Sequence, residues 1–222
     1  MPGQRLVLAS ASPRRAELLT AAGFTFAVLA VDLDERAQPG EAPADYVRRL
    51  AAEKSARAFE LLEGAARETP GERGGRGARG ARDARAVRLA EEGPPATKTL
   101  RPGEVVVLGA DTTVVVGGEI LGKPAHDRDA GRMLRLLSGR AHEVMTGISL
   151  RSAAGEVGGV ETTTVWFARL SPDDIAEYVA SGEGRGRPAG TPFKASRRGS
   201  SHGSRGLIRT LSGSRLRWSA RR

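Results

Sequence analysis

The chain alternates between short apolar runs rich in β-branched residues and longer segments whose apolar residues recur at helical spacing. Runs of the first kind are too short for helices and predict strands. They cover residues 5–9, 24–31, 105–108, 113–116, 142–151 and 158–170. Segments of the second kind predict helices over residues 41–62 and 128–138, and two more that begin at Pro13 and Pro172. This order of elements predicts an α/β fold.

One carboxylate, Asp111, lies between the apolar runs 105–108 and 113–116. The pattern predicts that it interrupts two strands, and that Gly117-Gly118 then forms a hairpin leading to a strand at 119–121. An ionised carboxylate beside a buried strand is unfavourable unless it is paired, hydrogen-bonded or bound to a cation. Two interpretations are open: a turn in which Asp111 binds its own backbone, or a functional carboxylate.

The loop after the first predicted strand, Ser10-Ala11-Ser12-Pro13-Arg14-Arg15, gathers hydroxyl and guanidinium groups. Ser12 suits the N-cap of the helix that follows, and Pro13 suits its first position. Free N–H groups, the positive end of the helix dipole and two arginine forks favour an anion at this place. A well-capped helix with two solvated arginines explains the same residues equally well.

Three carboxylates, those of Asp32, Asp34 and Glu35, follow the second predicted strand. Such a group could hold Mg²⁺, which prefers a few carboxylates together with phosphate oxygens. A solvated turn is the alternative. Lys54 lies in the next predicted helix, but a lysine on a helix is usually solvated surface and indicates little by itself.

Residues 64–103 lack apolar periodicity and consist mainly of Gly, Arg, Ala and Pro. Such a segment cannot bury enough apolar surface to become ordered, so we predict a disordered insertion. Its Arg-Gly character could favour weak RNA contact. Acidic residues are interleaved and aromatic residues are absent, however, so the stacking that single-stranded nucleic acids require is missing.

The net charge of +9 taken alone suggests a nucleic-acid binder, but the basic residues are concentrated at one end of the chain. Residues 184–222 contain eleven Lys or Arg and no acidic residue, which leaves 24 basic against 26 acidic side chains in residues 1–183. The body of the protein therefore gives no electrostatic reason to expect nucleic acid as a partner. The tail itself is predicted to be basic and disordered.

Other features of composition narrow the class of protein. Cysteine is absent, which excludes disulfides and thiolate chemistry, and His126, His142 and His202 show no zinc-ligand spacing. No apolar stretch approaches the roughly 20 residues of a membrane span, and we expect no signal peptide. With 222 residues the chain can form one substantial core. We therefore expect a cytoplasmic protein without a membrane partner.

Seven motifs in order along the chain resemble the Maf-type nucleoside triphosphate pyrophosphatases. They are SASPRR, DLDE, LAAEKSARA, LGADTTV, GEILGKP, LSGRAHEVMTG and TTTVWFARLSPDDIAEYVASGE. The resemblance covers residues 5–183 apart from the insertion. It implies an elongated mixed sheet of the Maf/ITPase-like kind, with flanking helices and two lobes around a cleft. It also implies a homodimer, a divalent cation (Mg²⁺ or Mn²⁺), and hydrolysis of dTTP or UTP to the monophosphate and pyrophosphate.

The same resemblance assigns roles to individual residues. Asp111 matches the family's catalytic carboxylate, which would take a proton from the attacking water and contact the metal. Arg14 and Thr112 match positions linked to substrate choice. The remaining matches are cleft residues expected near the phosphates, with Glu35 near the metal; they are Ser10, Arg15, Glu35, Lys54 and Lys123. In-line attack on phosphorus requires such an oriented water and such cations.

The resemblance stops after Glu183, where the family would continue with a Trp-containing turn and a Gly-Tyr-Ala-Ile-Gln-Gly segment. Permitted codons for residues 184–222, regrouped one nucleotide back, give family-like sequence that begins WEGKAGGYAIQG. We therefore interpret the tail as the product of a one-nucleotide loss near the Glu183 codon. The lost segment would contain a third specificity residue, a Gln, and a core strand. A nucleic-acid-binding or regulatory protein, and an inactive remnant of the enzyme, are the alternatives.

Overall fold

The structure is a computed structural model that describes residues 5–67, 102–182, 208–210 and 217–221. Its helices are α1 (Pro13–Ala21), α2 (Pro43–Arg67), α3 (Asp127–Leu137) and α4 (Pro172–Ser181), with a short 3₁₀ turn, η2, at Pro102–Glu104. Its strands are β1 (Arg5–Ala9), β2 (Phe26–Val28), β3 (Val105–Val116), β4 (Glu119–Leu121), β5 (Ala141–Ser152), β6 (Gly155–Phe167), β7 (Ile208–Thr210) and β8 (Arg217–Arg221).

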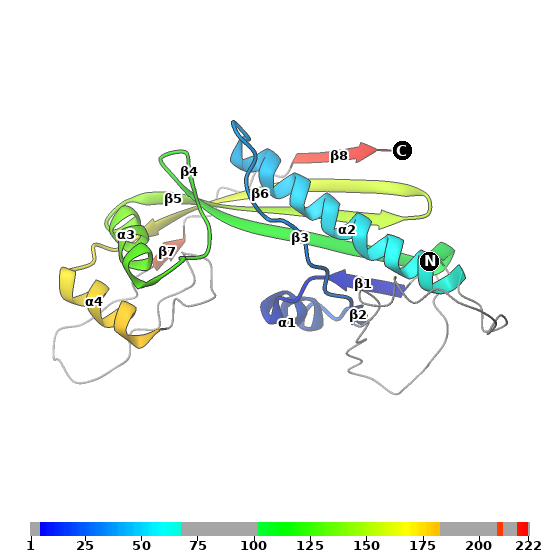
Figure 1. Cartoon of the computed structure of the whole chain (residues 1–222), viewed down its shortest axis with the longest axis horizontal. Helices are drawn as coiled ribbons and strands as arrows, with labels where there is room; N and C mark the ends of the chain where they lie inside the picture. The colour runs from blue at the N-terminus through cyan, green and yellow to red at the C-terminus, as the bar shows by residue number, and fades with distance from the viewer. Residues whose placement is uncertain (1–4, 68–101, 183–207, 211–216, 222) are drawn as a thin grey trace, which may run out of the picture.

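All described strands belong to one mixed sheet with the order β2-β1-β3-β5-β6-β7, in which β4 also pairs with β3 and β8 with β6. The β1 strand runs parallel to both β2 and β3, whereas the remaining pairs are antiparallel. The long strands β3, β5 and β6 give the molecule an elongated shape, and α2 lies along them (Figure 1). The predicted α/β class and elongated mixed sheet are confirmed.

The prediction that Asp111 interrupts two strands is wrong. β3 is one continuous strand of twelve residues, and its ladder with β5 runs unbroken from the pair Val107–Arg151 to the pair Val115–Glu143. Asp111 lies within this ladder, opposite Gly147. The prediction failed because a carboxylate inside a buried strand is normally unfavourable. Here the ammonium group of Lys54, on α2, compensates the charge of Asp111.

Most other predicted elements are found, with shifted ends. The second strand is shorter than the predicted 24–31, because its pairing with β1 ends at Val28. Helix α2 continues beyond the predicted residue 62 to Arg67, so its last turn enters the segment predicted as an insertion. Residues 68–101, the greater part of that segment, lie outside the described residues.

Two hydrophobic clusters lie at opposite ends of β3, in agreement with the two predicted lobes. One joins β1, α2 and the start of β3 around Val7, Ala58 and Val107. The other joins the end of β3 to β4, α3 and the end of β6, around Leu121 and Leu137. The polar middle of β3, which contains Asp111, lies between them.

Only backbone is described for the tail, and only in β7 and β8. These short strands pair with the two ends of β6 and so cover parts of an edge of the sheet. The rest of residues 183–222 lies outside the described part of the chain, so the predicted disorder of the tail and its frameshift origin remain predictions.

Candidate active site

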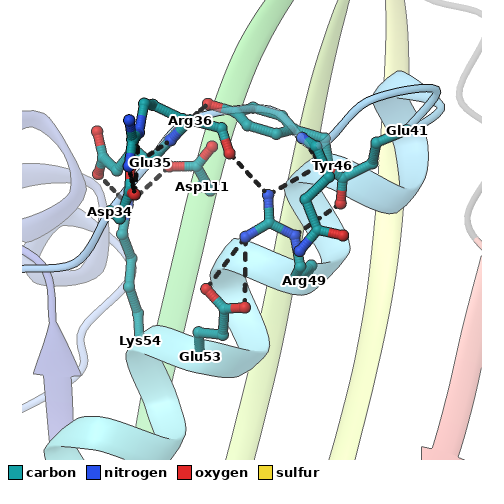
Figure 2. A network of polar contacts seen from close by, with 10 residues as sticks. Asp34, Glu35, Arg36, Glu41, Tyr46, Arg49, Glu53, Lys54 and Asp111 are labelled. Atoms are coloured by element: carbon teal, nitrogen blue, oxygen red, sulfur yellow. Dashed lines mark hydrogen bonds and ion pairs between the residues drawn. The ribbon is translucent and has the colours of Figure 1, made fainter.

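Lys54, on α2, joins two carboxylates from distant parts of the chain. Its Nζ lies 2.7 Å from Oδ1 of Asp111 on β3 and 2.7 Å from Oε1 of Glu35, in the loop between β2 and α2 (Figure 2). Lys54 is 7% exposed and Asp111 8%. Three residues that the family resemblance placed in one cleft therefore converge on one point.

The environments of these carboxylates shift their pKa values in opposite directions. Burial raises the pKa of Asp111, and the hydrogen bond and charge of Lys54 oppose this effect only in part. Burial also acts to raise the pKa of Glu35, but the hydrogen bond from Lys54, with the charges of Lys54, Lys123 and Arg15, outweighs it and lowers that pKa. Neighbouring titratable groups whose pKa values are pushed apart are typical of catalytic sites.

Two glycines allow α2 to approach Asp111. Gly109 precedes Asp111 by two residues on β3, so it lies on the same face of the sheet; Gly147 is the cross-strand partner of Asp111. A β-carbon would lie 2.1 Å from the Ala51 carbonyl oxygen at Gly109, and 2.2 Å from that of Val47 at Gly147. The helix backbone therefore rests directly on the sheet on both sides of Asp111, which brings Lys54 within reach.

A second chain of contacts runs from the loop before α1 to the neighbouring strands. Nη1 of Arg15 donates to Oγ of Ser10 at 2.8 Å, and Nη2 donates to Oγ1 of Thr112 at 3.2 Å. Thr112 Oγ1 in turn lies 3.1 Å from Thr146 Oγ1 on β5. Thr112 follows Asp111 directly, so the two chains of contacts meet on β3.

Ser12 occupies the N-cap position of α1, but its side chain makes no capping hydrogen bond. The prediction of Ser12 as the N-cap residue and Pro13 as the first helical residue is confirmed, although the cap lacks its side-chain hydrogen bond. Ser10 provides the local contact instead, since its Oγ accepts from the Ser12 N–H at 3.3 Å. The first-turn N–H groups of α1 are thus not taken up by the Ser12 hydroxyl.

The two remaining predicted residues lie at the margin of this network. Lys123 follows β4, and its Nζ lies 4.0 Å from Oε2 of Glu35, with 61% of its side chain exposed. Arg14 is exposed on α1. Within the described residues no hydrogen bond or ion pair joins Arg14 to the other candidates.

Sequence reasoning missed several residues at the site. Thr146 and the pair Tyr46 and Arg49 on α2 resemble ordinary strand and helix residues, and no pattern distinguishes them. The glycines could have been found, because a glycine inside a strand pattern often marks close approach of another backbone.

The donor atoms fit a divalent cation that also binds a phosphate. The described residues contain no cluster of three or more His, Cys, Asp or Glu that could enclose a metal ion. Mg²⁺, however, is typically held by one or two carboxylates plus substrate phosphates. Glu35 and Asp111 already converge on one cation, the Lys54 ammonium, which shows that this point favours positive charge.

No helix among the described ranges combines the length and apolar character that a membrane span needs.

Comparison with known proteins identifies the family of this chain. Residues 5–195 match the family model described as "Maf-like protein". This match extends beyond Glu183, where the sequence motifs end.

Three named relatives agree with this match. The dTTP/UTP pyrophosphatase of Anaeromyxobacter dehalogenans (strain 2CP-C) is 43% identical over 183 residues, which cover 81% of this chain and 72% of the relative. Proteins of the same name from Hahella chejuensis (42% identical; 82% and 73% covered) and Shewanella oneidensis (43%; 80% and 75%) are also similar. The chain belongs to the Maf-like protein family.

Proposed function

We propose that this protein hydrolyses nucleoside triphosphates, with dTTP and UTP as preferred substrates, to the nucleoside monophosphate and pyrophosphate. The observation that carries the proposal is the buried carboxylate of Asp111, held by Lys54 in the middle of the sheet and surrounded by cationic side chains. The names of the relatives supply the substrates. No described contact favours the nucleic-acid-binding alternative.

Asp111 acts in this proposal as the general base. Lys54 binds its Oδ1, whereas no protein group in the described residues donates to its Oδ2. This free oxygen can accept a proton from a water molecule aimed at the α-phosphorus. Because burial raises the pKa of Asp111, the ionised carboxylate is a stronger base than an exposed aspartate.

The cationic side chains bind the triphosphate and stabilise the charge that develops during attack. Lys54 is buried and Arg15 partly buried near Asp111, and Nζ of Lys123 lies 4.0 Å from Oε2 of Glu35. Arginine suits bidentate binding of phosphate oxygens, and lysine supplies a point charge. Ser10 fixes the Arg15 guanidinium through its hydroxyl. Thr112 accepts a hydrogen bond from the same guanidinium. In this proposal it influences which nucleotide fits the site.

Glu35 and Asp111 would hold Mg²⁺ or Mn²⁺ together with phosphate oxygens of the substrate. Such a cation neutralises the pyrophosphate leaving group and lowers the energy of the crowded phosphorus centre.

Hydrolysis in ¹⁸O-labelled water tests the reaction directly. We expect pyrophosphate release from dTTP and UTP in the presence of Mg²⁺ or Mn²⁺, with the ¹⁸O label in the monophosphate, since attack occurs at the α-phosphorus. Label in pyrophosphate would mean attack at the β-phosphorus, and label in inorganic phosphate attack at the γ-phosphorus; either result would contradict the proposal.

A version with the restored reading frame after Glu183 should accompany this chain in the same assay. The frameshift hypothesis predicts that the restored version is the more active. Absence of turnover by both versions, when both are folded, would overturn the catalytic assignment.

A further inference from the structure

Two side chains of α2 hold consecutive peptide groups of the loop that contains Glu35. The Tyr46 hydroxyl donates to the Glu35 carbonyl oxygen at 2.8 Å. One turn later, Nη2 of Arg49 donates to the Arg36 carbonyl oxygen at 3.1 Å (Figure 2). The peptide groups on both sides of Arg36, directly after Glu35, are therefore fixed to the helix that also supplies Lys54.

Arg49 is itself held rigidly. Its Nε and Nη2 bind the two carboxylate oxygens of Glu41 at 2.6 and 2.9 Å, a bidentate pair at the far end of the loop. Its Nη1 lies 3.2 Å from Glu53, one turn further along α2. The Glu41 side chain is only 9% exposed and that of Arg49 20%, so solvent weakens this pair less than a surface pair.

Glu35 needs such support because little else restrains it. Its side chain is 45% exposed, and its short contact is with Lys54 on one side. The described part of the loop between β2 and α2 has no regular secondary structure around it. A half-exposed carboxylate on such a loop would sample many positions, and a metal ligand must be held within about half an ångström of its working position.

We propose that Tyr46 and Arg49 are positioning residues that preorganise Glu35 for a divalent cation. They touch neither substrate nor metal; they hold the two consecutive peptide groups that directly follow the Cα of Glu35, and so restrict the backbone that carries its carboxylate. Loss of either contact weakens cation binding and leaves the chemical step unchanged once the cation is saturating. This inference rests on the proposed function, in which Glu35 helps to hold the metal.

The test is a Mn²⁺ titration followed by electron paramagnetic resonance, with UTP carrying a methylene bridge between its α- and β-phosphorus to prevent turnover. The variants are Tyr46→Phe, which removes only the hydroxyl, and Arg49→Lys, which keeps the charge but loses the fork. Arg48→Lys is the matched control. Arg48 directly precedes Arg49 on α2, and within the described contacts it pairs only with Asp45.

We expect the Mn²⁺ dissociation constant to rise about fivefold in Tyr46→Phe, the loss of one ordinary hydrogen bond, and further in Arg49→Lys, with no change in Arg48→Lys. The kcat for UTP at saturating Mn²⁺ should stay within about twofold of the parent in all three, as expected for positioning of a ligand and not of the base. Unfolding curves establish that each variant is folded.

Unchanged Mn²⁺ affinity in folded Tyr46→Phe and Arg49→Lys would overturn the inference. The same conclusion follows if Glu35→Gln leaves Mn²⁺ affinity unchanged, since Glu35 would then not be a ligand. In both cases, continued pyrophosphate release by the parent chain would leave the proposed function intact. If the parent chain releases no pyrophosphate although the Mn²⁺ affinities shift as expected, the proposed function fails and the role of Tyr46 and Arg49 stands.

Discussion

Two polar networks connect α2 to the sheet, and they differ in how completely their groups are satisfied. The site network joins Lys54 to Asp111 and Glu35. The second network begins at the adjacent residue, Ser55, whose Oγ lies 2.7 Å from Oγ of Ser149 on β5. Both are buried at the same helix–sheet interface, so burial alone does not distinguish a functional cluster from a structural one.

In the second network each group has a matching partner. Ser149 Oγ donates to Oε1 of Glu156 at 2.9 Å, and Nη2 of Arg151 lies 3.0 Å from Oε2. Both oxygens of this carboxylate are thus bound, and its charge is balanced by one guanidinium. Fully satisfied buried networks of this kind make a core rigid.

The site network lacks this balance. Two carboxylates share one ammonium, and one oxygen of Asp111 has no protein donor in the described residues. Burial raises the pKa of Asp111, and Lys54 offsets this effect only in part. An incompletely satisfied buried charge is unfavourable for folding, and we interpret it as the group kept available for water and cation.

Replacement of the catalytic carboxylate should have the largest effect. We predict that Asp111→Asn lowers kcat/KM for dTTP about a thousandfold, within the range for removal of a general base, as measured by pyrophosphate release. Asp34→Asn, a change of an exposed carboxylate that pairs with Arg36, should stay near the parent value. A kcat/KM for Asp111→Asn within tenfold of the parent value would show that Asp111 is not the general base.

Separation of α2 from the sheet should disturb both networks together. In Gly109→Ala the new methyl group would collide with the Ala51 carbonyl, so we predict a loss of about 3 kcal/mol in the free energy of unfolding, together with reduced activity. Urea titration measures the first effect. Gly64 lies at an open position on α2, so Gly64→Ala should instead raise the free energy of unfolding by about 1 kcal/mol. Equal stability of the two variants would refute the close approach.

Removal of a hydroxyl from the second network should affect stability alone. Ser149→Ala leaves Ser55 and Glu156 each without one partner, and we predict a loss of about 1–2 kcal/mol in the free energy of unfolding. The value of kcat/KM for dTTP should remain within about threefold of the parent. If this variant instead loses activity as Asp111→Asn does, the second network also belongs to the site.

The same comparison shows how far sequence reasoning reaches. The pattern of apolar residues was sufficient to predict β1, α1, α3, β5 and β6, because each of these patterns lies within one short segment of the sequence. It failed at Asp111, where the compensating Lys54 is 57 residues away in sequence and no local rule can supply it.

Family resemblance brought most site residues together, since it reflects tertiary contacts that periodicity does not. It offered no reason for the approach of α2 to the sheet or for the contact of Tyr46 with the Glu35 peptide. Both depend on the exact packing of one backbone against another, which only the folded structure displays.

The most direct test of the contrast between the networks is the pH dependence of unfolding for Asp111→Asn and the parent, without metal or nucleotide. Because its folded pKa is raised, Asp111 favours folding fully only below its unfolded pKa, near the ordinary value of 3.8, and this contribution is lost as pH rises through the folded pKa. We predict that Asp111→Asn is more stable than the parent at pH 7, and that its advantage shrinks as the pH falls toward 4. A variant less stable than the parent at pH 7 would mean that Asp111 is a satisfied structural group like Glu156, and would contradict the account.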